Sequence, residues 1–416
     1  MRRNKLVSDL KLALLFPAGR LRHYAGGMNT GQPVFRQLMA MIHPQQFDRC
    51  VQKYAGHYKV QQFTCWDQFL CMAYAQLTGR ESLRDIVDCL CARPERLYHL
   101  GFHGAVRRST LADANERRDW RIYATLAQQL IVRARRLYAG DPLAVDLEAT
   151  VYALDSTTVS LCLSLFRWAR FCRTKGAVKL HTLLDLRGPI PAFIHISDGK
   201  FHDGHALDEI PIEAGSFYVM DRGYLDFARL YALDQVGAYF VIRSRCSLQY
   251  VRTQSRPVEP GTGVQSDQII VLVIEHSQKG YPERLRRVRF FDAENQRFFV
   301  YLTNNFVLPA LTIAMLYKSR WQVELFFKWI KQHLRIKRFI GTSANAVKTQ
   351  IWIAICVYVQ VALLKKQLHL PQSLYKILRI LETHAFEKLS LVELLADSGP
   401  QEQNNQYSNQ MQLFEL

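Results

Sequence analysis

The stretch from Tyr317 to Lys331, YKSRWQVELFFKWIK, constrains this chain more than any other. It contains neither Gly nor Pro and is rich in strong helix formers, so it predicts a helix. Four polar residues follow one another at offsets of 0, 3, 7 and 14: Tyr317, Arg320, Glu324 and Lys331. At about 100° per residue, these offsets place all four on one narrow stripe. A carboxylate flanked by two cations and a phenol suits a metal ion beside a phosphate, and the alternative is an amphipathic helix with a solvated polar face.

The net charge of the chain favours a polyanionic partner. The 416 residues include 54 Lys and Arg against 36 Asp and Glu, which gives a net charge of +18, and the pI is about 9.6. Such a surplus favours DNA or RNA over a small neutral substrate. Two stretches, 156–184 and 317–348, are rich in cations and almost free of acids. We interpret them as surfaces that follow phosphates, and a solvated basic face is the alternative.

The hydrophobic pattern divides the chain into four parts. They are an extension at 1–27, an all-helical domain at 28–145, an α/β domain at 146–367, and a helical C-terminal segment with a disordered tail at 368–416. The extension is either disordered or lies upstream of a true start at Met28. In the α/β domain, short β-rich runs alternate with a helical run at 228–237, which indicates a mixed sheet. Further β-like runs between Gly/Pro-rich turns predict a β insertion at 246–304.

Neither the apolar runs nor the cysteines point to a membrane or a zinc site. The longest apolar stretch, 351–364, contains Gln360 and is too short to span a bilayer, so it predicts a buried helix. The nine cysteines form no CxxC pair, which favours reduced thiols over zinc ligands. We therefore expect a cytoplasmic protein without a membrane partner.

Two further carboxylates lie where apolar runs end. Asp155 follows VYAL and Asp221 follows FYVM. If these strands are neighbours, the carboxylates can lie side by side, and the helix with Glu324 can pack across them. Three converging carboxylates suit two Mg²⁺ (or Mn²⁺) ions, which can activate a nucleophile and stabilise the leaving oxygen in phosphoryl transfer. Each Asp alone could instead serve a turn, and a turn is also the expected role of Asp203, although His202 and Asp203 could assist the site.

Taken together, these motifs resemble the DDE transposases of bacterial insertion sequences, specifically the insertion-sequence-4 family. That family is marked by Tyr-x2-Arg-x3-Glu-x6-Lys, the spacing found from Tyr317 to Lys331. The contexts LDSTTV (154–159), DRGYLDF (221–227) and GAYFVIR (237–243) are also similar to it. The resemblance covers about 28–365.

The resemblance implies a fold class and a set of site residues. The fold is an RNase H-like α/β catalytic domain with a β-strand insertion, preceded by the helical domain, which binds DNA. Asp155, Asp221 and Glu324 are the implied catalytic residues and ligands of two Mg²⁺ or Mn²⁺ ions. The expected DNA contacts are Tyr317, Arg320, Lys331, Arg222, Lys179, Lys175, Arg243 and Lys328. An aromatic of the insertion is expected to stack on a flipped base, with Tyr250, Tyr281 and Phe290 as candidates.

The resemblance also implies an activity. The protein binds the terminal inverted repeats of its own element as a dimer in a synaptic complex, in the bacterial cytoplasm at the nucleoid. Water hydrolyses the 3′ end, the freed hydroxyl forms and reopens a hairpin on double-stranded DNA, and the end then joins target DNA. Two alternatives remain open at this point. They are an RNase H-like nuclease that does not join DNA, and a catalytically inactive DNA-binding derivative.

Overall fold

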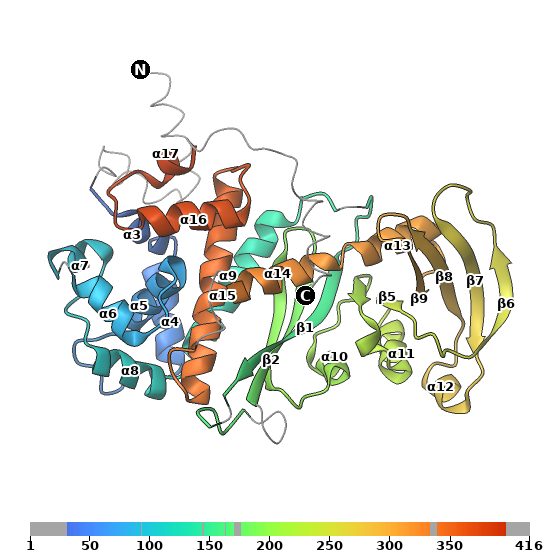
Figure 1. Cartoon of the computed structure of the whole chain (residues 1–416), viewed down its shortest axis with the longest axis horizontal. Helices are drawn as coiled ribbons and strands as arrows, with labels where there is room; N and C mark the ends of the chain where they lie inside the picture. The colour runs from blue at the N-terminus through green and yellow to red at the C-terminus, as the bar shows by residue number, and fades with distance from the viewer. Residues whose placement is uncertain are drawn as a thin grey trace, which may run out of the picture. The chain divides into compact units, whose positions relative to one another are not determined.

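The computed structural model describes residues 31–92, 94–143, 145–162, 164–169, 176–332 and 339–396. The expected N-terminal extension and C-terminal tail therefore fall outside the described residues. The chain forms two compact units, drawn in Figure 1. The first comprises the described parts of Met1–Leu130, His333–Gly341 and Asn345–Leu416, and the second comprises those of Ile131–Gln332 and Thr342–Ala344.

The first unit is helical, as its sequence predicted. Its helices are α3 (Val34–Met39), α4 (Pro44–Lys53), α5 (Cys65–Thr78), α6 (Leu83–Cys91), α7 (Pro94–Leu100), α8 (Arg108–Arg117), the first part of α9 (Arg121–Tyr138), α15 (Ala344–Gln367), α16 (Leu374–His384) and α17 (Leu391–Ala396). The start of α5 is fixed by a capping box between Thr64 and Asp67, and its end by Gly79 at φ 66°.

Helix α15 supplies much of the core of the first unit. It is long and apolar enough to cross a membrane by length and composition, but 94% of its most apolar window is buried inside the protein. The prediction of a buried helix at 351–364 is therefore confirmed. The hydrophobic pattern predicted this helix as part of the α/β domain at 146–367, whereas nearly all of it belongs to the same compact unit as the N-terminal helices.

The second unit is built on one nine-stranded sheet. Its strands are β1 (Val151–Leu161), β2 (Gly176–Asp185), β3 (Ile190–Asp198), β4 (Phe217–Met220), β5 (Tyr239–Arg243), β6 (Tyr250–Arg256), β7 (Val264–Leu272), β8 (Leu285–Asp292) and β9 (Arg297–Thr303). Their order is β3-β2-β1-β4-β5-β9-β8-β7-β6. Only the neighbours β1, β4 and β5 pair in parallel, so the sheet is mixed and mostly antiparallel.

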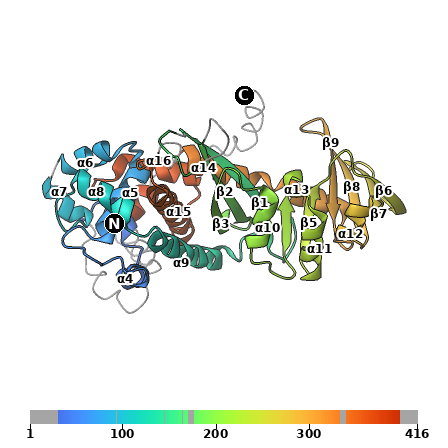
Figure 2. The ribbon, with the colours of Figure 1, turned by 90° about the horizontal axis from the view of Figure 1, so that it is seen from below.

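The β insertion extends this sheet. Strand β9 pairs with β5, and β6–β9 continue outward as an antiparallel set, at the end of the sheet away from β3 in Figure 2. The predicted strands are present, but two elements in this region were not predicted. They are β6, whose sequence YVRTQSR is mostly polar and exposed, and the short helix α12 (Glu275–Gly280), which was expected as a turn. Edge strands bury little, so their hydrophobic pattern is weak.

The two faces of the sheet carry different helices. We call one the α11 face, because buried Tyr152, Leu154 and Tyr218 cluster there with Leu230 of α11 (Phe227–Gln235). This face also bears the short elements η1 (Asp203–His205), α10 (Ala206–Glu209) and η2 (Arg222–Tyr224). We call the other the α13 face, because α13 (Ala310–Lys318) packs on it. Side chains alternate along a strand, so Asp155 points to the α13 face.

The predicted helix at 317–331 is interrupted. Helix α13 ends at Lys318 and α14 (Trp321–Gln332) begins three residues later, although the two follow nearly one line in Figure 1. Ser319 turns its hydroxyl back to the Leu316 carbonyl, and the Arg320 N–H donates to the Tyr317 carbonyl. A serine that binds the backbone and an i to i−3 bond tighten the chain into a turn, which the residue spacing alone did not reveal.

Candidate active site

The strand register brings two of the predicted carboxylates together. Strands β1 and β4 are parallel neighbours, and the last residues paired between them are Leu154 and Met220. The residues that follow on both strands are Asp155 and Asp221. Parallel neighbours are about 4.8 Å apart, so the two Asp are adjacent on the α13 face. The expectation that the strands are neighbours is confirmed, but β1 runs on to Leu161, so Asp155 is a mid-strand residue and not a strand end.

The turn between α13 and α14 reaches both carboxylates. Arg320 Nη1 donates to Asp155 Oδ2 at 2.8 Å, and Arg320 Nη2 donates to Glu324 Oε1. Tyr317 donates its hydroxyl to Asp221 Oδ1 at 3.2 Å. The other oxygen of Asp155, Oδ1, accepts the Ser156 backbone N–H at 2.8 Å. Tyr317 and Arg320 of the polar stripe therefore contact the two Asp despite the break in the helix, and Glu324 is bonded to the same Arg320.

The charges at this place act strongly on Asp155. The pKa of Asp155 is raised from 3.8 to about 6, mainly by burial and also by the nearby carboxylates of Glu324 and Asp221, which together outweigh the opposing effects of Arg320 and the Ser156 N–H. Burial also raises the pKa of Tyr317 to about 12, with Asp221 adding to the effect. The phenol is thus a neutral donor at physiological pH. Negative charge is in excess around Asp155, and a bound cation would reduce it.

The donor set fits hard divalent cations, although it is not assembled as a ligand cage. The part of the chain that the structure describes contains no ready group of three metal-ligating side chains. Asp155 and Asp221 lie side by side, while the Glu324 side chain is 49% exposed and bonded to Arg320. Carboxylate oxygens are the ligands that Mg²⁺ and Mn²⁺ prefer. For Glu324 to join the two Asp, its carboxylate must leave Arg320.

Several predicted DNA contacts lie near these carboxylates. Arg222 is exposed and directly follows Asp221. Arg243 ends β5, where the register of Met220 with Ile242 places it beside Asp221, and its guanidinium lies 5.0 Å from the Phe299 ring. The position of Arg243 agrees with a basic rim on the α13 face, and Arg222 lies at the end of β4 in η2.

Helix α14 carries the remaining predicted cations. Lys328 is exposed one turn after Glu324, and Lys331 is in the last turn of the helix. Trp321, the residue after Arg320, is 36% exposed. Lys175 lies outside the described residues.

Lys179 is held on the other side of the sheet. It pairs with Thr158 in the β1–β2 register, so it projects on the α11 face, opposite to Asp155. Its ammonium donates to Asp203 Oδ1 at 3.1 Å and to the Phe201 carbonyl at 3.2 Å. A contact between Lys179 and DNA stays a prediction, and in this structure its charge is neutralised by Asp203.

Asp203 and Tyr224 are two further polar residues of this neighbourhood. Asp203, for which a turn was the expected role and assistance to the site the alternative, accepts the Ser156 hydroxyl at 2.6 Å. This contact depends on the sheet register and on the path of the loop after β3. Tyr224 is buried three residues after Asp221. Burial and the charges of Asp155 and Asp203 raise the pKa of Tyr224 well above its usual value.

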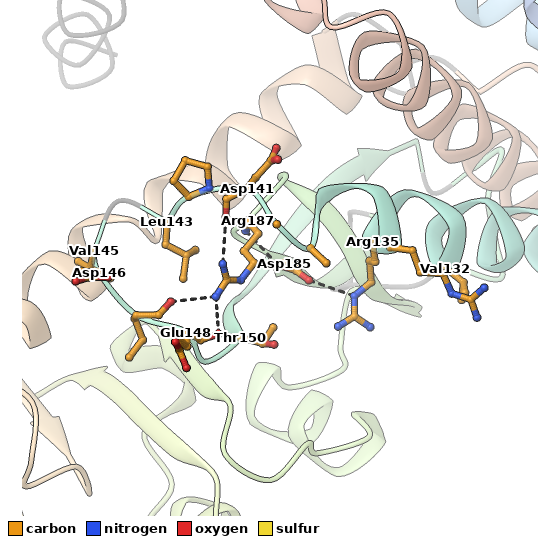
Figure 3. A pocket seen from close by; sticks show the side chains of 15 residues that line it. Val132, Arg135, Asp141, Leu143, Val145, Asp146, Glu148, Thr150, Asp185 and Arg187 are labelled. Carbon is orange, nitrogen blue, oxygen red and sulfur yellow. Dashed lines mark hydrogen bonds and ion pairs between the residues drawn. The ribbon is translucent and has the colours of Figure 1, made fainter. Parts of the chain in front are cut away.

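A cavity of this unit lies elsewhere. It has a volume of about 970 Å³ and lies between the end of α9 and the start of β1, where Arg187 donates to the carbonyls of Asp141 and Leu147 at 3.1 and 3.0 Å (Figure 3). Arg135 pairs with Asp185 at its wall. None of the predicted site residues lines it. Its arginine therefore anchors the loop that leads into β1, and the candidate site lies outside this cavity.

Comparison with known proteins assigns the chain to a family. Residues 146–360 match the transposase DDE domain. The chain belongs to the DDE transposase family. Residues 30–103 of this transposase match a domain of unknown function, DUF4372. The family implies an RNase H-like fold and an enzyme that cleaves and transfers DNA strands, generally with divalent metal ions.

Three relatives carry the names of transposases. One from Sinorhizobium fredii (strain NBRC 101917 / NGR234), y4zB, is 34% identical over 255 residues, which are 60% of this chain and 68% of the relative. One from Geobacillus stearothermophilus, named for insertion sequence element IS5377, is 33% identical over 50% of this chain and 54% of the relative. One from Synechocystis sp. (strain ATCC 27184 / PCC 6803 / Kazusa), named for element IS4SA, is 26% identical over 70% and 81%. The protein is a transposase of insertion sequence elements.

Proposed function

We propose that this transposase is a member of the insertion-sequence-4 group and that Asp155, Asp221 and Glu324 form its catalytic set. The observation that carries the proposal is the register that ends at Leu154 and Met220, because it makes the two Asp neighbours. The hydrogen bonds of Arg320 connect Asp155 with Glu324, and the Tyr317 hydroxyl of the same segment bonds Asp221. The three would hold Mg²⁺ or Mn²⁺, in two sites.

The residues around the three carboxylates would have different roles in the reaction. A pair of divalent ions, when bound, would activate the attacking oxygen and stabilise the leaving oxygen. With the carboxylates occupied, Arg320 would be released to grip a phosphate of the cleaved end, for which its planar fork is suited. Tyr317 holds Asp221 by its neutral hydroxyl. Lys331, Lys328, Arg222 and Arg243 would hold the DNA backbone as rim charges.

We also propose a substrate and an order of steps for the reaction. Double-stranded DNA is the substrate, as the terminal inverted repeats of the element, and residues 28–145 bind it. Hydrolysis at the 3′ end is followed by attack of the freed hydroxyl on the opposite strand, a hairpin, its reopening and joining to target DNA. Two protomers would act in one synaptic complex, at the nucleoid in the bacterial cytoplasm. The net charge of +18 supports a polyanionic substrate.

The exposure of the three candidate aromatics in the insertion narrows the choice of the one that would stack on a flipped base. Tyr281 is 1% exposed and Phe290 is 8% exposed, so both are core residues. Tyr250 is half-buried at the start of β6, with the Arg287 guanidinium 5.0 Å from its ring. Of the three candidates, Tyr250 alone is accessible to a base.

The proposal is tested with oligonucleotide duplexes that carry the inverted repeats flanking the gene. Glu324→Gln should abolish Mg²⁺-dependent nicking and leave binding of the end within about twofold, because it removes a metal ligand and little surface. The matched control is Glu275→Gln, because Glu275 also pairs with a cation four residues away, Lys279. Equal nicking by Glu324→Gln and the parent would refute the assignment. Nicking by the parent without joining of a pre-cleaved end would instead indicate a nuclease.

A further inference from the structure

A buried polar network lies on the α11 face of β1, directly behind Asp155. Ser156 follows Asp155 and points to the opposite, α11 face of the sheet. Its hydroxyl donates to Asp203 Oδ1 at 2.6 Å, while its backbone N–H donates to Asp155 Oδ1 at 2.8 Å. One residue therefore connects Asp203 on one face with Asp155 on the other.

Asp203 is itself fixed from β2. Lys179 Nζ lies 3.1 Å from Asp203 Oδ1, and the Lys179 side chain is only 14% exposed. His181, fully buried, has Nδ1 3.7 Å from the same oxygen. Burial acts to raise the pKa of Asp203, but the bonds from Ser156 and Lys179 hold it below its usual value, so the group is a carboxylate. The network thus contains a paired carboxylate and ammonium.

We propose that Asp203 is a positioning residue for Asp155, acting through Ser156 so that the Asp155 carboxylate is oriented to bind the divalent metal. This inference rests on the proposed function, because it takes Asp155 to be a metal ligand. Hydrogen bonds that orient ligating carboxylates commonly contribute ten- to a hundredfold to metal affinity or activity. Asp203 touches neither substrate nor metal, so its effect is on the geometry of Asp155.

The network also assigns a role to Lys179 that differs from a DNA contact. Its ammonium is the cation that keeps Asp203 ionised and in place, on the face of the sheet opposite to the carboxylates. Loss of Lys179 would leave Asp203 with the Ser156 hydroxyl and the more distant His181 ring. We therefore place Lys179 in the support of the site.

The test measures three properties of the full chain. Binding of Mn²⁺ is monitored by electron paramagnetic resonance of the free ion, and binding and nicking of end DNA are measured alongside it. Asp203→Asn should weaken Mn²⁺ binding about tenfold or more and lower the rate of nicking. It should leave the dissociation constant for end DNA, measured in Ca²⁺, within about twofold. A merely structural role would lower the melting temperature and leave Mn²⁺ affinity unchanged in the folded fraction.

A second variant covers the case in which Asp203→Asn fails to fold because Lys179 is left unpaired. Ser156→Ala keeps the Lys179–Asp203 pair and removes only the hydroxyl that connects it to β1, and it should weaken Mn²⁺ binding in the same direction. The matched control is Asp208→Asn, an exposed carboxylate of the same segment that pairs with Arg229. Asp208→Asn should bind Mn²⁺ and nick end DNA as the parent does.

The outcomes separate the two proposals. Parent-like Mn²⁺ binding by both Asp203→Asn and Ser156→Ala would overturn the positioning role and leave the catalytic assignment intact. A parent protein that binds no Mn²⁺ and nicks no end DNA would overturn both. Weakened Mn²⁺ binding in the two variants, with the control unaffected, supports the positioning role.

Discussion

The guanidinium of Arg320 donates to Asp155 at 2.8 Å, although the two residues are 165 positions apart in the chain. The same guanidinium bonds Glu324, so one arginine pairs with two carboxylates that we assign to metal binding. A cation between two ligands competes with a metal ion for them. The arginine must therefore exchange partners, from carboxylates to a DNA phosphate, when metal and substrate bind.

Arg320→Ala should consequently raise the affinity for the metal ion and lower the affinity for DNA. Without the competing cation, Mn²⁺ should bind severalfold more tightly in the absence of DNA. Without the phosphate contact, the complex with a cleaved end in Ca²⁺ should weaken about tenfold or more. Both are measured by titration of the same preparation. Arg229→Ala is the control, because Arg229 also bridges two carboxylates, Asp208 and Asp226. A fall in both affinities would contradict the exchange.

Acid should weaken the fold through His181. Burial lowers the pKa of His181 from 6.5 to about 4, with Lys179 and His195 acting in the same direction and Asp203 against them. The unfolded chain therefore binds this proton more readily than the folded one. The stability from neutral His181 is fully present above pH 6.5 and is lost as the pH falls from 6.5 to 4, up to about 3 kcal/mol.

Urea unfolding of His181→Gln at pH 7.5 and pH 4.8 measures this contribution. The variant should lose less free energy of unfolding between the two values than the parent. His205→Gln is the control, because the His205 side chain is 57% exposed. An equal loss in parent and His181→Gln would show that His181 does not carry the acid dependence.

The buried pair of Arg286 and Asp267 should stabilise the start of α13. The two side chains are 1% and 3% exposed, and Arg286 also donates to the carbonyls of Asn305 and Leu308, just before that helix. Asp267→Ala leaves a buried charge unpaired, which costs about 3–5 kcal/mol. Urea unfolding should show this loss, whereas Glu275→Ala at an exposed ion pair should change little. A loss below about 1 kcal/mol would mean that water or another acid replaces Asp267.

The sequence predicted the parts of this unit that depend on local pattern. The alternation in VYALDSTTVSL and the apolar run FYVM identified β1 and β4, and their following acids are the residues that the sheet brings together. The turn at Ser319 was missed because a serine that bonds its own backbone looks like any helical serine in sequence. The contact of Asp203 with Ser156 could not be predicted, because it depends on the β1–β2 register and on the path of the loop after β3. For the same reason Lys179 looked like one more free cation.

Tyr317→Phe isolates the hydroxyl that holds Asp221. The Tyr317 ring packs against Tyr301 with centroids 4.6 Å apart, and phenylalanine preserves that contact, so the melting temperature should change little. The bond to Asp221 at 3.2 Å is lost, and Asp221 becomes less well oriented beside Asp155. A hydrogen bond to a charged group contributes roughly 1.5–3 kcal/mol, so single-turnover nicking should slow about ten- to a hundredfold. Tyr301→Phe keeps the Tyr317–Asp221 bond and should nick at the parental rate. If the two variants slow nicking equally, the effect comes from ring packing, and the hydroxyl of Tyr317 has no part in orienting Asp221.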